Sequence, residues 1–181
     1  DSVPVKKVMA SVPVDTTVYR FDELRADITS ADNTINSSFP DYAPLINADG
    51  SIMVFTSRRP VNKKDIQKGR VGKENVFMAH YDTKNKAWLT AEMMGSEINL
   101  PEADNSAVAL SGDGQRMLLY RGNDENNPDG NIYESVLKGD QWSEPVKLPA
   151  PINMNSNETS ASISSDGQTI YFVSDRKGGF G

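Results

Sequence analysis

The sequence predicts an all-β protein built from one antiparallel sheet unit that is repeated along the chain. Three observations predict it: a stretch of fixed spacing occurs three times, an Asp-Gly pair divides two apolar segments in every copy, and a Trp closes the first two copies at the same position. The chain has 181 residues and is 37% hydrophobic, which is enough for one ordinary core.

The repeated stretch runs from an Asn through an acid to an Asp-Gly pair. In each copy the acid follows the Asn by five residues, and the Asp-Gly follows the acid by eight, nine and eight residues. Such agreement between segments that otherwise differ indicates an internal repeat. The motif residues are Asn36, Asp41, Asp49 and Gly50; Asn99, Asp104, Asp113 and Gly114; and Asn153, Glu158, Asp166 and Gly167.

Each Asp-Gly pair predicts a β-hairpin. Gly tolerates the positive φ that tight turns require, and Asp bonds its own backbone. The strand after the first turn is apolar from Ile52 to Phe55, which is typical of a strand covered on both faces.

Two further strands follow each of the first two hairpins. Residues 75–81 and 131–137 are the predicted third strands, and residues 87–89 and 141–143 the fourth. Trp88 and Trp142 each precede the next repeat's Asn by eleven residues, and this shared position favours packing between sheets over an exposed platform for sugar. Residues 58–74 read as a long loop. The unit is a four-stranded meander.

Four strands per unit, with repeats of 63 and 54 residues, predict a partial β-propeller of four-stranded antiparallel blades. We expect blade-like repeats at 35–97 and 98–151 and an incomplete one at 152–181. Residues 1–34 are expected to form an extended segment or outer strands, with a strand at 17–21 and one helical turn at 22–25. Two to three blades do not close a ring, so we expect a fragment of a larger propeller.

The third copy carries a family likeness. The pattern Ser164-Ser165-Asp166-Gly167, followed by Ile170, Phe172, Ser174 and Arg176, resembles the WD-like propeller repeat of the TolB type, whose Ser-Pro-Asp-Gly turn has Ala48, Gly112 and Ser165 here in place of Pro.

A narrower group is resembled by three parts of the chain: Ile152-Asn153 with Glu158, residues 171–181, and the Trp142-Ser143-Glu144-Pro145-Val146 segment. Its members are periplasmic, outer-membrane-associated proteins of Bacteroidetes-type bacteria that combine tetratricopeptide repeats, a propeller and an OmpA-like peptidoglycan-binding domain; one branch serves type IX secretion and gliding. The resemblance implies a periplasmic scaffold.

Composition excludes several classes of function. A net charge of −6 argues against nucleic acid, which needs clustered Lys and Arg. Without cysteine there is no disulfide, thiol catalysis or Cys-ligated metal. No apolar run approaches the roughly 20 residues of a membrane-spanning helix. The start at Asp1 reads like an internal cut or a processed end.

Candidate chemistry is sparse. His80 is the only histidine, so a zinc or catalytic role is disfavoured, and we expect no cofactor. The oxygen-rich residues 123–131 favour a turn-forming linker over a calcium loop. The basic pair Lys63-Lys64 reads as solvated loop rather than a phosphate site.

The charged residues of the repeat invite two hypotheses. The acids Asp41, Asp104 and Glu158 lie in different repeats, too far apart for paired acid–base work. We expect them to bond backbone amides or the repeat's own Asn or Ser. Arg58, Arg59 and Arg176 follow second strands and are expected to pair with acids of the same chain.

The repeated fold predicts a non-enzymatic protein-interaction scaffold, and the resemblance implies that it belongs to the cell envelope, in the periplasm and associated with the outer membrane. Its expected partners are envelope proteins, and peptidoglycan through a domain outside this chain. Two alternatives stay open: an accessory propeller of a peptidase or hydrolase, and a glycan-binding propeller.

Overall fold

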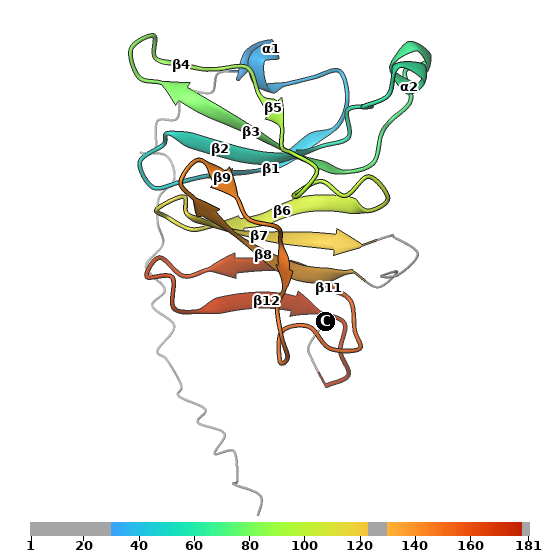
Figure 1. The fold of residues 1–181 in the computed structure, drawn as a ribbon, viewed down its shortest axis with the longest axis vertical. Helices are drawn as coiled ribbons and strands as arrows, with labels where there is room; N and C mark the ends of the chain where they lie inside the picture. The colour runs from blue at the N-terminus through green and yellow to red at the C-terminus, as the bar shows by residue number, and fades with distance from the viewer. Residues whose placement is uncertain (1–29, 123–129, 179–181) are drawn as a thin grey trace, which may run out of the picture. The chain divides into compact units, whose positions relative to one another are not determined.

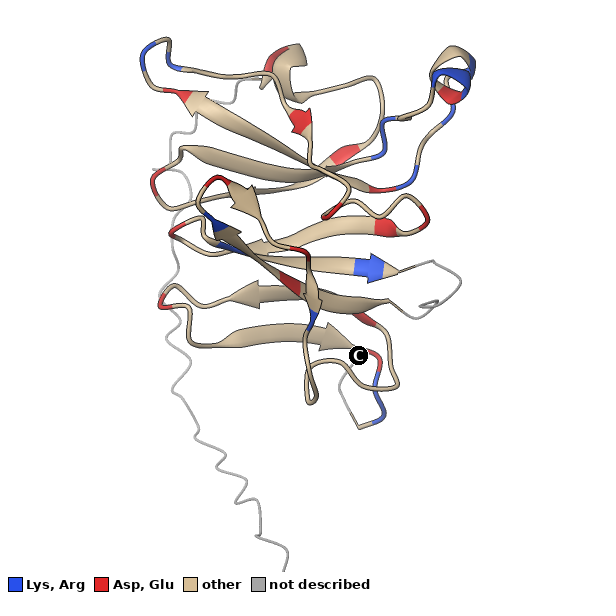
Figure 2. Cartoon of the chain, in the orientation of Figure 1, with Lys and Arg blue, Asp and Glu red and all other residues tan. Residues whose placement is uncertain are grey.

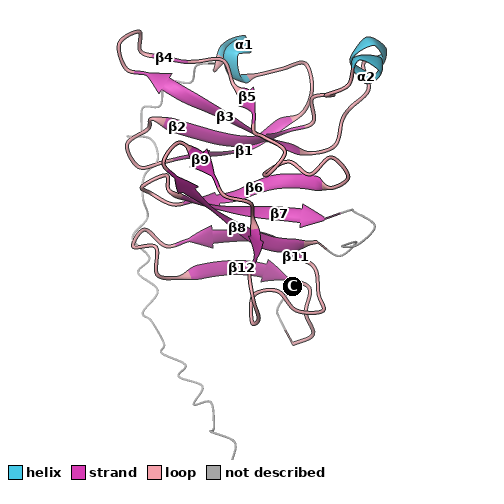
Figure 3. Cartoon of the chain, viewed as in Figure 1, coloured by secondary structure: helices cyan, strands magenta, loops and turns pink. Residues whose placement is uncertain are grey.

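The computed structural model describes residues 30–122 and 130–178, and it is all-β apart from two short helices (Figures 1 and 3). Every described helix and strand belongs to the unit of residues 31–181. The helices are α1 (Asp32–Ile35) and α2 (Lys63–Lys68).

Sheet 1 is an antiparallel meander. Its strands are β1 (Asp41–Ile46), β2 (Ile52–Ser57), β3 (Asn75–Asp82), β4 (Ala87–Trp88) and β5 (Glu92–Met93). Both β4 and β5 pair with β3, through Tyr81 opposite Trp88 and Phe77 opposite Met93. The fourth position of the sheet is therefore filled by two short strands.

Sheet 2 repeats this arrangement, and sheet 3 has only its first two strands. Sheet 2 contains β6 (Asp104–Leu110), β7 (Arg116–Gly122), β8 (Asn131–Lys138), β9 (Gln141–Trp142) and β10 (Val146–Lys147), with β9 and β10 sharing the fourth position along β8. Sheet 3 is the hairpin of β11 (Glu158–Ile163) and β12 (Ile170–Ser174).

The three Asp-Gly turns share one geometry, as the hairpin prediction requires. The turn glycines Gly50, Gly114 and Gly167 have φ of 74°, 70° and 71°, a region that favours glycine. The Asp before each glycine accepts the backbone N–H two residues on, at 2.9 to 3.0 Å. The turns lie on the same side of the sheets (Figure 1), and Ala48 N–H of the first donates to Gly112 O of the second at 2.8 Å.

Side chains alternate between the faces of each sheet, so that the apolar core lies in layers. One cluster packs sheet 1 on sheet 2 and includes Val54, Val76, Met117 and Leu119. A second packs sheet 2 on sheet 3 through Leu118, Ile132, Ala161 and Phe172. A third lies on the other face of sheet 1, where Ile35 and Ala91 cover Phe55 and Phe77.

Two elements differ from the sequence prediction. The stretch 58–74 is not a plain loop, because it contains α2, which Asn62 and Gly69 cap. The fourth strand extends beyond the predicted Trp segments, since β5 and β10 continue the pairing after a break. The strand expected at 17–21 and the helical turn at 22–25 lie outside the described residues. In the described part of the chain, neither helix has the length and apolarity to cross a bilayer.

Candidate interaction surfaces

The repeat Asn joins neighbouring sheets. Asn99 is 5% exposed and bonds β3 of sheet 1: its Oδ1 accepts Val76 N–H at 2.7 Å, and its Nδ2 donates to Val76 O and Met94 O. Asn153 bonds sheet 2 in the same way. Its Oδ1 accepts the N–H of Ile132 on β8, and its Nδ2 donates to Ile132 O and to Leu148 O. Each Asn therefore completes the sheet that precedes it in the chain.

Asn36, the first copy of this residue, lies in a different environment. It is exposed and follows the last residue of α1, where its N–H donates to Asp32 O at 2.9 Å. Among the described residues no sheet precedes sheet 1 in the chain.

The repeat acids bond nearby backbone and hydroxyl groups, as hypothesised. Asp41 Oδ2 accepts Ser37 N–H at 2.6 Å and Ser37 Oγ at 2.8 Å. Asp104 Oδ1 accepts Glu74 N–H at 3.0 Å, and Glu158 Oε1 accepts Ser156 Oγ at 2.5 Å. Asp41 and Glu158 therefore hold the chain where it enters β1 and β11, whereas Asp104 joins the start of β6 to the residue before β3 of sheet 1.

Burial raises the pKa of Glu158, but hydrogen bonds from Ser156, Ser174 and Arg176 outweigh it, and the pKa lies below its usual range. The pKa of Asp41 is low in the same way, with burial opposed by hydrogen bonds from Ser57 and Ser37 and by the charge of Arg59. Both carboxylates are therefore held in the ionised form.

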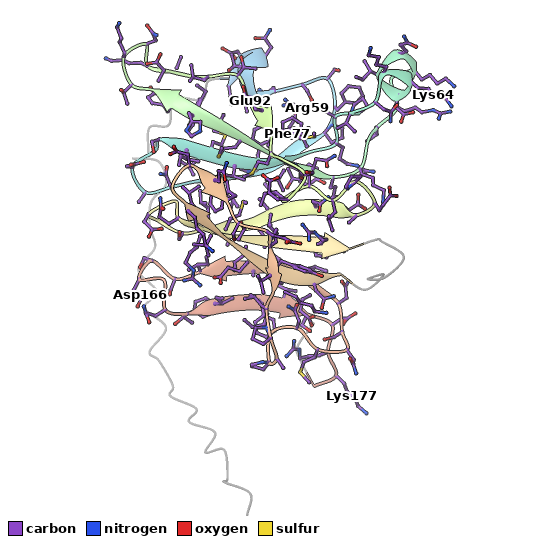
Figure 4. All side chains as sticks on the ribbon, viewed as in Figure 1. Arg59, Lys64, Phe77, Glu92, Asp166 and Lys177 are labelled. Atoms are coloured by element: carbon purple, nitrogen blue, oxygen red, sulfur yellow. The ribbon has the colours of Figure 1, made fainter. Side chains whose placement is uncertain are left out.

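An arginine clamp recurs in all three repeats. The guanidinium donates to the carbonyl of the Ile that precedes the repeat Asn: Arg59 to Ile35 O, Arg121 to Ile98 O and Arg176 to Ile152 O. Each guanidinium also lies over an aromatic ring, 4.7 Å from Phe77, 5.0 Å from Tyr133 and 4.7 Å from Phe172. Figure 4 shows Arg59 beside Phe77.

Two of these arginines form the predicted ion pairs. Arg59 lies 3.2 Å from Asp41, and Arg176 lies 3.1 Å from the fully buried Glu158. Arg58, the third arginine of that hypothesis, instead donates through Nε to Gly72 O at 3.1 Å. The arginines that follow the second strands therefore stabilise the fold.

The predicted packing of tryptophan between sheets is confirmed for Trp142 and differs for Trp88. Trp142 is 9% exposed and belongs to the cluster between sheets 1 and 2. Trp88 is half-buried against the outer cluster of sheet 1, with its ring 5.2 Å from that of Tyr81.

His80 is exposed on β3. Across residues 30–122 and 130–178, no group of three His, Cys, Asp or Glu side chains could hold a metal. Residues 123–129, most of the oxygen-rich stretch weighed as a calcium loop, lie outside the described residues.

A groove of about 430 Å³ lies along the outer strands of sheets 1 and 2. Its apolar lining comes from Met78 on β3, from Met94, and from Trp142 on β9. A smaller hollow of about 210 Å³ adjoins it, shares Met78 and Met94, and adds the exposed side chains of Leu89 and Met93.

Carboxylates surround this apolar lining. Glu97 and Asp140 line the groove, Glu92 lines the adjoining hollow, and all three are exposed. No Lys or Arg contributes to the lining of either hollow. The combined surface, which we name the methionine groove, is apolar at its base and negative at its rim.

Sequence reasoning missed three of these features. The Arg clamp had a partial signal, because Arg59 and Arg176 both follow their turn glycine by nine residues, whereas Arg121 follows Gly114 by seven. The backbone bonds of the repeat Asn and the methionine groove had none, because both join residues of different repeats.

The comparisons with known proteins give no family for this chain. No protein-family model matches it, and no curated protein matches it at a significant level.

Proposed function

We propose that this chain is part of a β-propeller and acts as a non-enzymatic scaffold that binds protein partners. The propeller architecture is supported by the repeated meander and by first strands that neighbour one another, β1 beside β6 and β6 beside β11. Neighbouring sheets also meet at their turns: Ala48 N–H of the first turn donates to Gly112 O of the second, and Arg116 at the start of β7 donates to Gly167 O of the third turn at 2.9 Å.

The observation that carries the proposal is the methionine groove. Methionine is unbranched and flexible, so a surface lined by Met78, Met94 and Met93 adapts to different apolar side chains. The acids at its rim favour an occupant with positive charge. The groove therefore fits a protein segment in which apolar residues stand between Lys or Arg.

The repeated polar residues stabilise the fold and are not available for binding a partner through their bonded groups. Asn99, Asn153, Arg59 and Arg176 use their polar groups to bond the backbone of this chain. Recognition is therefore assigned to surfaces that differ between repeats, as is usual where loops on a rigid frame carry function.

The proposed location is the periplasm, in association with the outer membrane, with partners drawn from the cell envelope and with peptidoglycan contacted through a further domain. Its support is the resemblance of residues 171–181 and of the Trp142-Ser143-Glu144-Pro145-Val146 segment to the periplasmic, outer-membrane-associated group. Cell fractionation of the producing organism tests it, and recovery in the cytosolic fraction would contradict it.

The binding test uses a short fluorescein-labelled peptide of repeated Lys-Leu-Leu, titrated with the protein. Glu97→Gln combined with Asp140→Asn should weaken binding about fivefold, because two rim charges are removed. Glu102→Gln, which neutralises an exposed acid outside the groove lining, is the control and should change binding less than twofold. Equal weakening by the two variants, or no binding of the peptide, would contradict the groove as the binding site.

A further inference from the structure

The loop that joins β2 to β3 is a folded projection. Its helix α2 buries none of its residues, yet both ends are capped. Asn62 Oδ1 accepts Asp65 N–H at 2.9 Å, and Gly69, with a φ of 60°, donates to Asp65 O and Ile66 O. Arg70 lies 3.7 Å from Asp65. The segment is therefore ordered by its own bonds and not by packing on the sheet.

Two neighbouring points hold this projection at its base. Gly72 N–H donates to Arg58 O at 2.8 Å, and Arg58 Nε donates back to Gly72 O. A Cβ at Gly72 would lie 2.8 Å from Arg59 O, so the segments on either side of the projection approach too closely for any other residue at position 72. The projection thus has a fixed position on sheet 1.

Positive charge is concentrated on this loop. Residues 58–73 contain seven of the chain's 19 Lys and Arg residues and one acid, Asp65, while the whole chain has a net charge of −6. Arg58, Arg59 and Lys73 bond within the protein at the base. The outward part keeps Lys63, Lys64, Lys68 and Arg70, all exposed, and Figure 2 shows this concentration at α2.

Apolar side chains stand among these charges. Val61, Ile66 and Val71 are 60%, 54% and 52% exposed, at a spacing of five residues. Residues 61–71, named the basic head here, therefore present cations and aliphatic groups together. The sequence at the matching position of the second repeat, residues 123–130, contains three acids and no base, so this property belongs to the first repeat and not to the repeated unit.

The chemistry of the basic head selects among anionic partners. It has no aromatic residue on which a nucleic-acid base could stack. A six-residue helix is too short for an amphipathic helix lying in a membrane surface. The acidic remainder of the chain repels polyanionic surfaces, whereas a short acidic segment reaches the head alone, because salt screens charge beyond about 8 Å.

Building on the proposed scaffold function, we propose that the basic head docks an acidic segment of a partner protein, in which aliphatic residues stand among Asp and Glu. Lys63, Lys64 and Lys68 meet its carboxylates, and Ile66 with its neighbouring valines covers its aliphatic side chains. The protein then carries two docking surfaces of opposite charge preference, the methionine groove for a basic segment and the basic head for an acidic one.

The test measures fluorescence anisotropy of a labelled peptide of repeated Glu-Glu-Leu at physiological salt. Lys63→Gln, Lys64→Gln and Lys68→Gln together should weaken binding about tenfold, because three charge contacts are lost while helix propensity is kept. Ile66→Ser should weaken it about threefold. The control triple Lys84→Gln, Lys147→Gln and Lys177→Gln removes the same charge from exposed sites elsewhere and should change binding less than twofold.

Four results would overturn the proposal: equal weakening by the two triple variants, no binding of the acidic peptide, preference for vesicles of anionic phospholipid or for single-stranded DNA, or self-association of the protein that depends on the three head lysines. Binding of the Lys-Leu-Leu peptide by the head variant serves as a separate readout. If the head variant still binds the Lys-Leu-Leu peptide while the parent protein does not bind the Glu-Glu-Leu peptide, the basic-head proposal fails and the scaffold proposal stands.

Discussion

Sheet 3 and the two larger sheets place the same sequence position in opposite environments. Four residues after the turn glycine, sheet 1 has Val54 and sheet 2 has Leu118, both 0% exposed, whereas sheet 3 has Tyr171 at 63%. Val54 and Leu118 each face the following sheet, and no described sheet follows sheet 3. The burial of this position thus depends on the next repeat more than on its own hairpin.

The first prediction sharpens this comparison and has the largest expected effect. Leu118→Ala should lower the free energy of unfolding by about 2–5 kcal/mol, because it leaves a cavity between sheets 2 and 3. Tyr171→Ala, at the matching position, should change it by less than about 0.5 kcal/mol. Urea unfolding of both variants measures the difference, and similar losses would show that Tyr171 is covered in solution.

The second prediction concerns the Asn that joins one sheet to the next. Asn153→Ala leaves the buried N–H of Ile132 without its partner, which costs about 1–3 kcal/mol. It also removes one hydrogen bond from Leu148 O and one from Ile132 O, which keeps the N–H of Leu148, so a total loss of about 2–4 kcal/mol is expected. Asn36→Ala, at the exposed first copy, should cost less than about 1 kcal/mol. Equal losses of stability in thermal unfolding would mean that Asn36 and Asn153 make equivalent contributions, which would contradict this prediction.

The third prediction uses the low pKa of Glu158. Glu158→Gln should cost about 1–3 kcal/mol at neutral pH, since the hydroxyl groups of Ser156 and Ser174 and the guanidinium of Arg176 lose an ionised acceptor. Because the folded-state pKa lies below the ordinary value of about 4.3, this contribution is present above that pH and disappears as the pH falls through the folded value.

Unfolding followed between about pH 7 and pH 3 checks this sign. The gap in stability between the parent protein and Glu158→Gln should narrow below about pH 4. A gap that widens with acid would mean that Glu158 is protonated in the fold.

The fourth prediction has the smallest effect and compares two turns. Gly114→Ala and Gly167→Ala each place a side chain at positive φ, which costs about 1–2 kcal/mol. Gly114→Ala should be the more costly, because its Cβ would lie 3.2 Å from Asn47 Nδ2, whereas that of residue 167 has no neighbour closer than 3.7 Å. The reverse order in melting temperature would contradict the turn-to-turn contact.

The sequence predicted what depends on neighbours along the chain. The Asp-Gly hairpins, the third strands and the bonds of Asp41 and Glu158 all join residues close in sequence or fixed by the repeat. Helix α2 also has local signals in the sequence: an Asn stands before it with an acid three residues on, and a Gly follows it. The pairs that escaped prediction, such as Asn99 with Val76 and Met78 with Trp142, join different repeats.

The residues that join the sheets recur in the repeats and form what we call the frame, whereas the two proposed binding surfaces do not recur. The Asn and Arg residues of the frame recur because every sheet must be joined to its neighbour. The methionine groove and the basic head occur once each, in regions where the two larger sheets differ in composition or loop length. Variants of the frame should therefore change stability, and variants of the two surfaces should change binding.

Each repeat completes the sheet before it, and hydrogen exchange of Asn153→Ala measures this role. Asn153 lies in the third repeat, yet its bonds hold β8 of sheet 2. We expect the amides of Asn131–Lys138 to lose protection by at least about tenfold, while those of the β11–β12 hairpin change little. Loss of protection confined to residues 158–174 would contradict it.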